Sequence, residues 1–390
     1  MPDTVIHWFR RDLRLDDNSA FSAALRSEDQ VLPVFIIDDA IVGHHVGAHR
    51  LRFLRTALVD LDAQLQRRGS RLLVRRGDAP RELNRIADEA TAWGAYLNRD
   101  YTPYARQRDT RATRGLQMTG VVTQTFDDLL LVSPHATLDA DGLPAPDFDT
   151  FSSRWLERFD LDPAPPATTG PLVPAAEMPE SIPDWPESIA PGLLSPSGWP
   201  GATPRSAQER LDDFISNLLA GYPPSREEAD QGTSRLSAAL KFGTISVRDV
   251  ARAALRRAAA DESCRSGAER FLSRLCRRDY AHHLLHARPD LVRSWPPPAA
   301  GGEPDPGPAT ALAAWCEGRT GRADLDVGMR RLVDDGWASD SARSELASAL
   351  VRDIGASPAA GIRHFAGHLV DFDVACDLLG WLEVAGVVPG

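Results

Sequence analysis

Three aspartates near the C-terminus are the residues of this chain best suited to chemistry. Asp371, Asp373 and Asp377 lie within the otherwise apolar stretch of residues 369–381. An unpaired carboxylate in apolar surroundings is costly, so such acids need a partner or a bound group. Acids on the surface of a helix are the plainer alternative, because charged residues are usually exposed. The pattern favours a binding site and leaves a solvated helix face as the alternative.

A second group of candidate residues lies at the start of an apolar helical run, in residues 232–246. Thr233, Ser234 and Ser237 place hydroxyls beside the free backbone N–H groups of a helix start, where phosphate binds readily. A helix cap without any ligand is the simpler explanation of such a triplet taken alone.

Histidines and cysteines give no support for a metal site. His364 and His368 are four residues apart on one predicted helix, but the sequence offers neither a third ligand nor a zinc-protease motif. The cysteines form no CxxC pair, so we expect reduced thiols, as in a cytosolic protein. These cysteines are Cys264, Cys276, Cys316 and Cys376.

The first third of the chain alternates short apolar runs with helix-like stretches. The expected strands are residues 4–9, 31–37, 71–74, 93–98 and 121–125, and the expected helices are residues 18–27 and 47–68. This alternation predicts a parallel, Rossmann-like α/β sheet. No glycine-rich phosphate loop follows the first run, so a nucleotide site there has no support.

The rest of the chain has a different composition. Residues 161–204 are rich in proline, glycine and serine, a composition that is typical of a connector rather than of a core element. Beyond them, helix-period stretches of Ala, Leu and Arg predict an all-helical domain, interrupted by a loop at 295–308. The expected domains are 1–130 (α/β), 131–204 (connector) and 205–390 (helical).

Composition limits the partners. The formal net charge is −11 and the isoelectric point is near 5.4, which argues against a protein whose whole surface binds nucleic acid. The start of the sequence lacks a charged segment followed by an apolar one, and no run approaches the length of a membrane span. We therefore expect a cytoplasmic protein without a membrane partner.

Several motifs resemble one known family. Residues 7–18, HWFRRDLRLDDN, resemble the opening of photolyases and cryptochromes nearly letter for letter. Further resembling segments are 98–101, 148–151, 232–246, 315–321 and 369–381. The resemblance implies an FAD-binding helical domain and leaves the antenna chromophore undecided.

The resemblance also assigns FAD contacts to individual residues. These are Tyr222, Thr233, Ser234, Arg235, Leu236, Ser237, Arg278, Asp340, Arg343, Asp371, Asp373 and Asp377. It implies that Arg343 pairs with Asp371 beside the isoalloxazine and that Asp377 faces flavin N5. Photolyases usually carry asparagine there, so Asp377 is closer to plant-type cryptochromes. Burial would raise the pKa of Asp377 and let it donate a proton near neutral pH.

The substrate side departs from the family pattern. Arg274 and Arg277 stand where photolyases carry the glutamate and the tryptophan that contact damaged pyrimidines, and Asp340 replaces an asparagine near the cofactor. Two guanidiniums favour an anionic ligand, unless they are simply solvated. The candidate catalytic residues are Asp377, Arg274 and Arg277.

These observations lead to three hypotheses. The preferred one is a divergent, shortened family member that has lost repair of pyrimidine dimers and serves as a sensor or as a flavoenzyme on a small anionic molecule. The second is a light-dependent deoxyribodipyrimidine photolyase, with nucleic acid as the less favoured partner. The third is an interaction module without cofactor.

Overall fold

The N-terminal third folds around a parallel sheet, as the alternation of apolar runs predicts. The strands are β1 (Thr4–Phe9), β2 (Gln30–Asp38), β3 (Leu73–Gly77), β4 (Ala92–Asn98) and β5 (Val122–Phe126). Their order is β3-β2-β1-β4-β5, and every neighbouring pair is parallel. Strands β1 and β2 are buried almost throughout, which explains why they consist of nearly continuous apolar runs.

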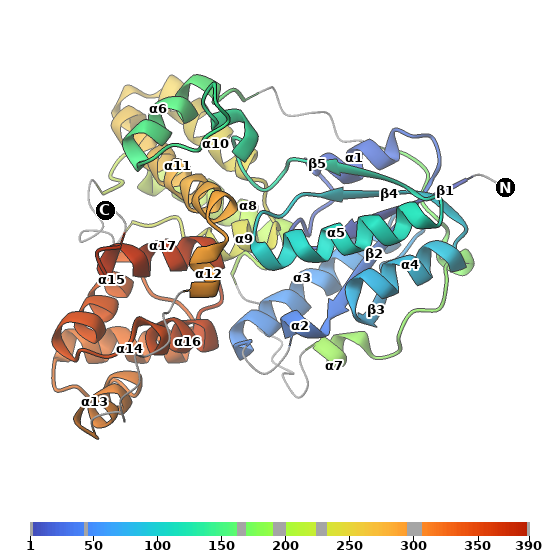
Figure 1. Ribbon diagram of the computed structural model, residues 1–390. Coiled ribbons are helices and arrows are strands. Elements are labelled where there is room, and N and C mark those ends of the chain that lie inside the picture. The colour runs from blue at the N-terminus through green and yellow to red at the C-terminus, as the bar shows by residue number, and fades with distance from the viewer. Residues whose placement is uncertain are drawn as a thin grey trace.

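Helices cover both faces of this sheet (Figure 1). They are α1 (Ser19–Leu25), α2 (Asp39–Val42), α3 (Ala48–Gln66), α4 (Ala79–Glu89) and α5 (Pro103–Met118). Buried side chains of α1 and α3 form one core with the sheet, and buried side chains of α4 and α5 form another. The sheet therefore lies between two helical layers.

The computed structural model describes residues 3–42, 46–161, 169–189, 200–223, 232–294 and 306–387. Most of the loop expected at 295–308, and parts of the proline-rich connector, lie outside these residues. Beyond β5 the described elements are helical. They are α6 (Phe148–Arg158), α7 (Trp185–Ile189), α8 (Pro204–Asp213), α9 (Ser237–Phe242), α10 (Val247–Ala260), α11 (Arg265–Ala287), α12 (Asp290–Ser294), α13 (Pro306–Cys316), α14 (Ala323–Asp335), α15 (Asp340–Ser348), α16 (Pro358–His368) and α17 (Val374–Val384).

The segment assigned to the connector contributes buried residues to a core of each half. Trp185 and Ile189 of α7 are buried in the core that the sheet shares with α3. Trp155 of α6 is buried against α11, where its Nε1 donates to Asp279 at 3.0 Å. A proline-rich composition thus excludes long regular elements here but does not exclude buried anchor residues.

The two halves touch closely at α9 (Figure 1). The backbone N–H of Leu13 donates to the carbonyl of Phe242 at 3.1 Å. Gly243 ends α9 with a φ of 70°, and a Cβ there would lie 2.1 Å from the carbonyl oxygen of Arg11. Glycine permits both the left-handed conformation and this approach of two backbones.

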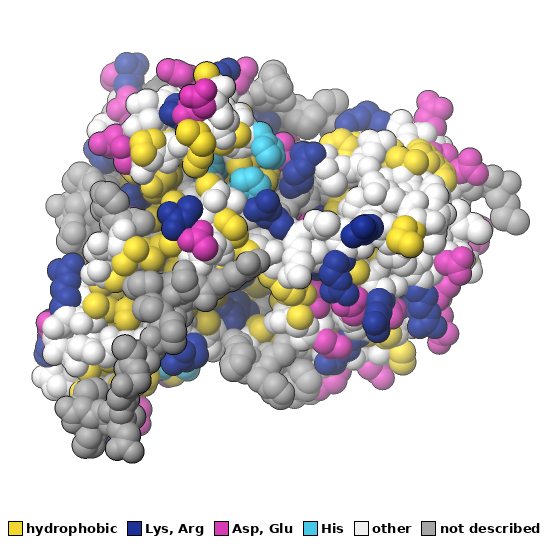
Figure 2. All heavy atoms as spheres, viewed as in Figure 1, with side chains coloured by type: hydrophobic (Ala, Val, Ile, Leu, Met, Phe, Trp, Pro, Cys, Tyr) yellow, Lys and Arg dark blue, Asp and Glu magenta, His cyan; other side chains and the backbone are white. Residues whose placement is uncertain are grey.

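Charged side chains of both signs lie on the visible surface (Figure 2). On the face shown in Figure 2, the basic side chains of the described residues are interspersed with acidic ones. In the part of the chain that the structure describes, no helix combines the length and the apolar character needed to cross a membrane.

Candidate functional site

A cavity of about 290 Å³ opens in the helical half, and its wall brings together all the candidate residues. This volume is near the lower end of ordinary ligand pockets. The candidates that line it are Tyr222, Thr233, Ser234, Arg235, Leu236, Ser237, Arg274, Arg277, Arg278, Asp340, Arg343, Asp371, Asp373 and Asp377. They come from segments up to 155 positions apart, so only the fold makes them one site.

The turn into α17 fixes the positions of the aspartates. Asp373 caps this helix, because its carboxylate accepts from the backbone N–H groups of Ala375 and Cys376 at 2.9 and 3.3 Å. Asp377 lies one turn further on and accepts from the N–H of Asp373 at 2.7 Å. Both acids therefore belong to the same part of the cavity wall. All three aspartates are buried and do not lie on a solvated helix face.

Arg343 and Asp371 form the ion pair that the resemblance implies. Nη2 of Arg343 donates to both carboxylate oxygens of Asp371, at 2.8 and 2.7 Å. Ser237 donates to Asp371 at 2.5 Å, and Nε of Arg343 donates to the carbonyl of Ala338 at 2.9 Å. Burial alone would lower the pKa of Arg343, but the charges of Asp371 and Asp377 raise it above its ordinary value. This guanidinium is a fixed positive charge in the wall.

Asp377 has a pKa raised to about 7, which agrees with the expectation for a shielded acid. Burial is the main cause, the charge of Arg343 opposes it, and Asp371 and Asp373 add to it. Nη1 of Arg343 lies 3.5 Å from the carboxylate of Asp377. A carboxyl group with this pKa can give or take a proton near neutral pH.

Asp373 has the opposite electrostatic character. Burial would raise its pKa, but Arg11, His282 and Lys241 hold it well below its usual range. Arg11 forms an ion pair with Asp373, and Nε2 of His282 lies 3.6 Å from it. The cavity therefore holds two neighbouring carboxyl groups whose environments separate their pKa values, an arrangement suited to acid–base roles.

Arg277 and Arg274 lie in different surroundings. Arg277 forms an ion pair with Glu383 of α17, and its guanidinium lies 5.2 Å from the ring of Phe148. The side chain of Arg274 forms a hydrogen bond with the side chain of Tyr222. Among the described residues, Arg274 forms no ion pair, so it is the guanidinium of the two that can serve an anionic ligand.

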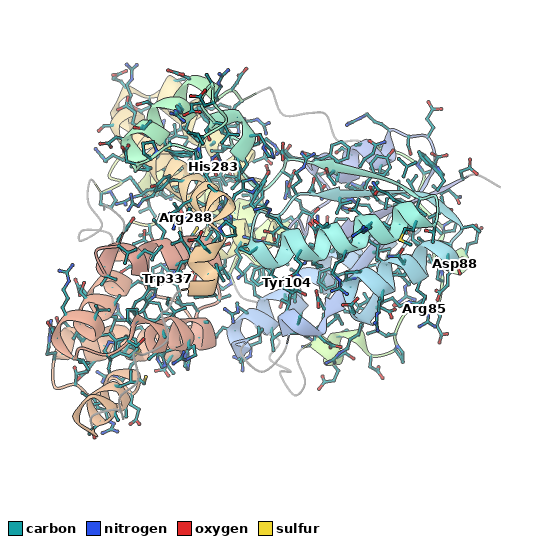
Figure 3. All side chains as sticks on the ribbon, in the orientation of Figure 1. Arg85, Asp88, Tyr104, His283, Arg288 and Trp337 are labelled. Atoms are coloured by element: carbon teal, nitrogen blue, oxygen red, sulfur yellow. The ribbon has the colours of Figure 1, made fainter. Side chains whose placement is uncertain are left out.

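Near the hydroxyl-rich segment, Arg235 lies over the ring of Trp337 at 4.5 Å and has a φ of 49°. Figure 3 labels Trp337 among the C-terminal helices and Tyr104 on α5 of the sheet domain.

Ser234 accepts from the N–H of Leu236 at 3.4 Å, and Ser237 begins α9. Nη1 of Arg278 donates to the carbonyl of Leu129 at 2.9 Å.

The lining fits an FAD molecule chemically. Hydroxyls and Arg235 can hold phosphate, since guanidinium and hydroxyl groups are its usual partners. The apolar walls from Leu240, Phe271 and Trp381 can receive flat rings. Arg343 supplies a positive charge beside the carboxylates.

Sequence reasoning missed three residues of the site. Nζ of Lys241 donates to the carbonyl of Phe372, and its pKa is lowered to about 8 by burial and by Arg50. Arg11 forms an ion pair with Asp373 of the wall, and Glu383 forms one with Arg277. In each case the two partners come from different segments of the chain. The signal for Lys241 was its place in the 232–246 motif; nothing in the sequence pairs Arg11 or Glu383 with their partners.

One set of metal-ligating groups borders the cavity. Donor atoms of His282, Asp373 and Cys376 all lie within 4.8 Å of one another. Burial and the charges of Arg278 and Arg11 lower the pKa of His282 to about 3, although Asp373 and Asp100 act in the opposite direction. Arg11 already forms an ion pair with Asp373, so a metal cation bound here would compete with that guanidinium for the carboxylate.

Comparisons with known proteins agree with this geometry. Residues 5–171 match the family model of DNA photolyase, and residues 271–389 match the FAD binding domain of DNA photolyase. A deoxyribodipyrimidine photo-lyase of Synechococcus sp. is 32% identical over 98% of this chain and 81% of the relative. Cryptochrome-1 of Arabidopsis thaliana is 31% identical over 98% of this chain and 58% of the relative.

The structural comparison points the same way. The crystal structure of a bacterial class III photolyase from Agrobacterium tumefaciens has a TM-score of 0.83 and 30% identity, covering 99% of this chain and 80% of the other. A Synechocystis cryptochrome has a TM-score of 0.88 at 22% identity, covering 100% and 83%, and shows the shared fold.

Proposed function

Because the chain belongs to the photolyase/cryptochrome family and carries its FAD-binding domain, we propose that it is a flavoprotein that does not repair pyrimidine dimers. In this proposal it serves as a sensor or as an enzyme acting on a small anionic ligand. The observation that carries the proposal is the Arg277–Glu383 ion pair in the cavity region.

This ion pair changes what the cavity can receive. The side chains of Arg277 and Glu383 are 16% and 9% exposed, so both charges are largely withdrawn from water. A flat, neutral base stacked at this place would have to displace Arg277 from Phe148 as well. Breaking a buried pair leaves an uncompensated charge, which costs about 3–5 kcal/mol. Stacking on an aromatic residue is worth only about 1–3 kcal/mol per base.

Arg274 supports the anionic part of the proposal. It lines the same cavity, and no carboxylate of the described residues pairs with it. Arg235 is in a similar situation, since its contact is with the ring of Trp337. Guanidinium groups bind carboxylate and phosphate in a two-pronged geometry. With Arg235 beside the hydroxyls that can hold the FAD phosphate, Arg274 is the donor that the cavity has left for a further anion.

The chain's own acid–base machinery is the pair Asp373 and Asp377. Asp373 stays ionised, because its pKa lies well below its usual range. Asp377, with its pKa near 7, holds or releases a proton at its carboxylate while Arg343 keeps it in place. When bound, the flavin supplies the electron transfer.

Light-dependent repair of DNA is the second candidate. The observation in its favour is the identity of about 32% with deoxyribodipyrimidine photo-lyases of Synechococcus sp. and Streptomyces griseus. In this reading the ion pair opens when a flipped base enters, and Arg274 contacts a phosphate rather than a small molecule.

The deciding experiment combines a visible spectrum with a repair assay. The purified protein is examined for flavin absorbance and then mixed with ultraviolet-irradiated and intact DNA at 50 and 200 mM salt, in darkness and under blue light. We expect bound flavin, equal weak affinity for both DNAs and no loss of dimers under light. Tighter, salt-sensitive binding of damaged DNA with repair would overturn the proposal in favour of the second candidate.

A colourless protein that takes up no added FAD would refute both candidates. The variant Arg277→Trp with Glu383→Gln provides a further check, since it removes the ion pair without leaving a single buried charge. Under the proposal this variant gains affinity for damaged DNA relative to the parent. An unchanged affinity would mean that the ion pair does not exclude the base.

A further inference from the structure

A cluster of potential soft-metal ligands lies outside the cavity, between α14 and α16, which Figure 1 shows in orange and red. Nε2 of His364 lies 3.2 Å from Sδ of Met329. The rings of His364 and His368 have centroids 4.4 Å apart. Two helices therefore bring two imidazoles and one thioether together.

The hydrogen bonds of His368 leave one of its nitrogens available. Its Nδ1 lies 2.9 Å from the carbonyl oxygen of His364, and only a protonated nitrogen can donate to a carbonyl. Nε2 of a neutral His368 therefore carries the lone pair. A metal-binding histidine usually donates its other ring N–H to a carbonyl or a carboxylate in this way.

The spacing of the donor atoms of His364 and Met329 suits a shared ion. Nε2 of His364 and Sδ of Met329 are 3.2 Å apart. An ion bonded to this nitrogen at about 2.0 Å and to this sulfur at about 2.3 Å would have an angle of roughly 95° between the two bonds. Histidines four residues apart lie on the same side of a helix, as His364 and His368 do in α16.

We propose that His364, His368 and Met329 form a binding site for a soft metal ion of the Cu(I) type. A thioether is a soft ligand that selects Cu(I), and imidazole is compatible with that choice. Met329 is 1% exposed, and the ring of Trp315 lies 5.4 Å from that of His364, so the ion is shielded from water on these sides. The sequence predicts no metal because it shows only the two histidines.

The competing explanation is a weak N–H···S hydrogen bond between His364 and Met329 in an apolar setting. The two explanations differ in what the three side chains do together. A hydrogen bond needs only His364 and Met329, whereas a metal site also depends on His368.

The test is an anaerobic Cu(I) titration of the purified full chain against a coloured Cu(I) chelator. We expect one equivalent of Cu(I) to be retained against the chelator. Met329→Leu, His364→Gln and His368→Gln should each weaken binding at least about tenfold, since loss of even a supporting group costs this much. Met329→Leu nearly conserves volume and should remain folded, which urea unfolding checks.

Matched controls use exposed residues of the same types. Met118, which is 82% exposed, and the exposed His135 should tolerate Met118→Leu and His135→Gln without any change in Cu(I) affinity. X-ray absorption should show sulfur in the first coordination shell of the parent and lose it in Met329→Leu.

Three outcomes overturn the proposal. They are complete removal of Cu(I) by the chelator, parental affinity in Met329→Leu, and binding that disappears in Cys316→Ser but persists in the three ligand variants. The last outcome would assign the copper to a thiol. None of these measurements depends on FAD or DNA, so the result is independent of the proposed function.

Discussion

Arg11, which follows the first strand, forms an ion pair with Asp373, which lies 362 positions later and caps the last described helix. Nε of Arg11 also donates to the carbonyl of Lys241 at 3.1 Å. The sheet domain thus holds two segments of the cavity wall. This contact gives the N-terminal family motif a structural role in the site of the other half.

The substitution Arg11→Met should lower the free energy of unfolding by about 3 kcal/mol, because it leaves the carboxylate of Asp373 buried without its main partner. Urea unfolding measures the change. The control is Arg68→Met, whose ion pair with Asp16 is long, 3.9 Å, and exposed. It should change stability by less than about 1 kcal/mol. Equal effects of the two substitutions would refute a special role of Arg11.

The pKa of Asp377 predicts a pH dependence of stability. The pKa is about 7 in the folded protein, whereas an unfolded aspartate has a pKa near 3.9. Between these values only the folded state holds the proton, so the free energy of unfolding falls as pH rises, by at most about 1.4 kcal/mol per pH unit. Above pH 7 this contribution levels off.

Asp377→Asn should remove this component. The free energy of unfolding of the variant minus that of the parent should increase from pH 5 to pH 7 and then stay constant. Urea unfolding at several pH values measures this difference. Asp353→Asn, at an exposed ion pair with Arg322, serves as the control without such a trend. Parallel pH profiles for parent and Asp377→Asn would contradict the assigned pKa.

Asp371→Asn should weaken flavin retention. The change removes the charge that Arg343 binds through both carboxylate oxygens, and it leaves the guanidinium only the longer contact with Asp377, at 3.5 Å. We expect a lower ratio of flavin to protein absorbance and a loss of about 3 kcal/mol in stability of the protein without flavin. Retention equal to that of the parent would show that this ion pair does not support the cofactor.

A double-mutant cycle should reveal strong coupling between Arg277 and Glu383. Arg277→Met and Glu383→Gln should each destabilise the protein, and the double variant should recover part of the loss, with a coupling of about 2 kcal/mol. The exposed pair Arg319 and Glu317 provides the comparison, with an expected coupling below about 1 kcal/mol. Additive effects at Arg277 and Glu383 would remove the argument that this pair closes the cavity to bases.

Two glycines of α16 allow a matched test of the packing behind Trp381. A Cβ at Gly361 would lie 2.0 Å from the ring of Trp381, whereas no atom of the described residues lies within 4 Å of a Cβ at Gly367. Gly361→Ala should displace Trp381 from the cavity wall, change its fluorescence and lower stability by about 1–3 kcal/mol. Gly367→Ala should be neutral or slightly stabilising, because alanine favours a helix. Similar effects of both would contradict this packing.

The sequence by itself determined the fold class and the parts of the site that are local. Alternating apolar runs predicted the parallel sheet, since the pattern of burial is written along each strand. The aspartates at 371, 373 and 377 and the hydroxyls at 233–237 were visible because each group lies in one short segment. The pairing of Arg343 with Asp371 followed from the family resemblance and is confirmed.

The tertiary structure decided which charges neutralise one another. The guanidinium of Arg277 can donate to any acid within reach, and only the packing of α11 against α17 selects Glu383. Arg11 meets Asp373, and Met329 meets His364, for the same reason. An ion pair or a ligand set depends on distances of a few ångströms between segments far apart in the chain, and no local pattern records such distances.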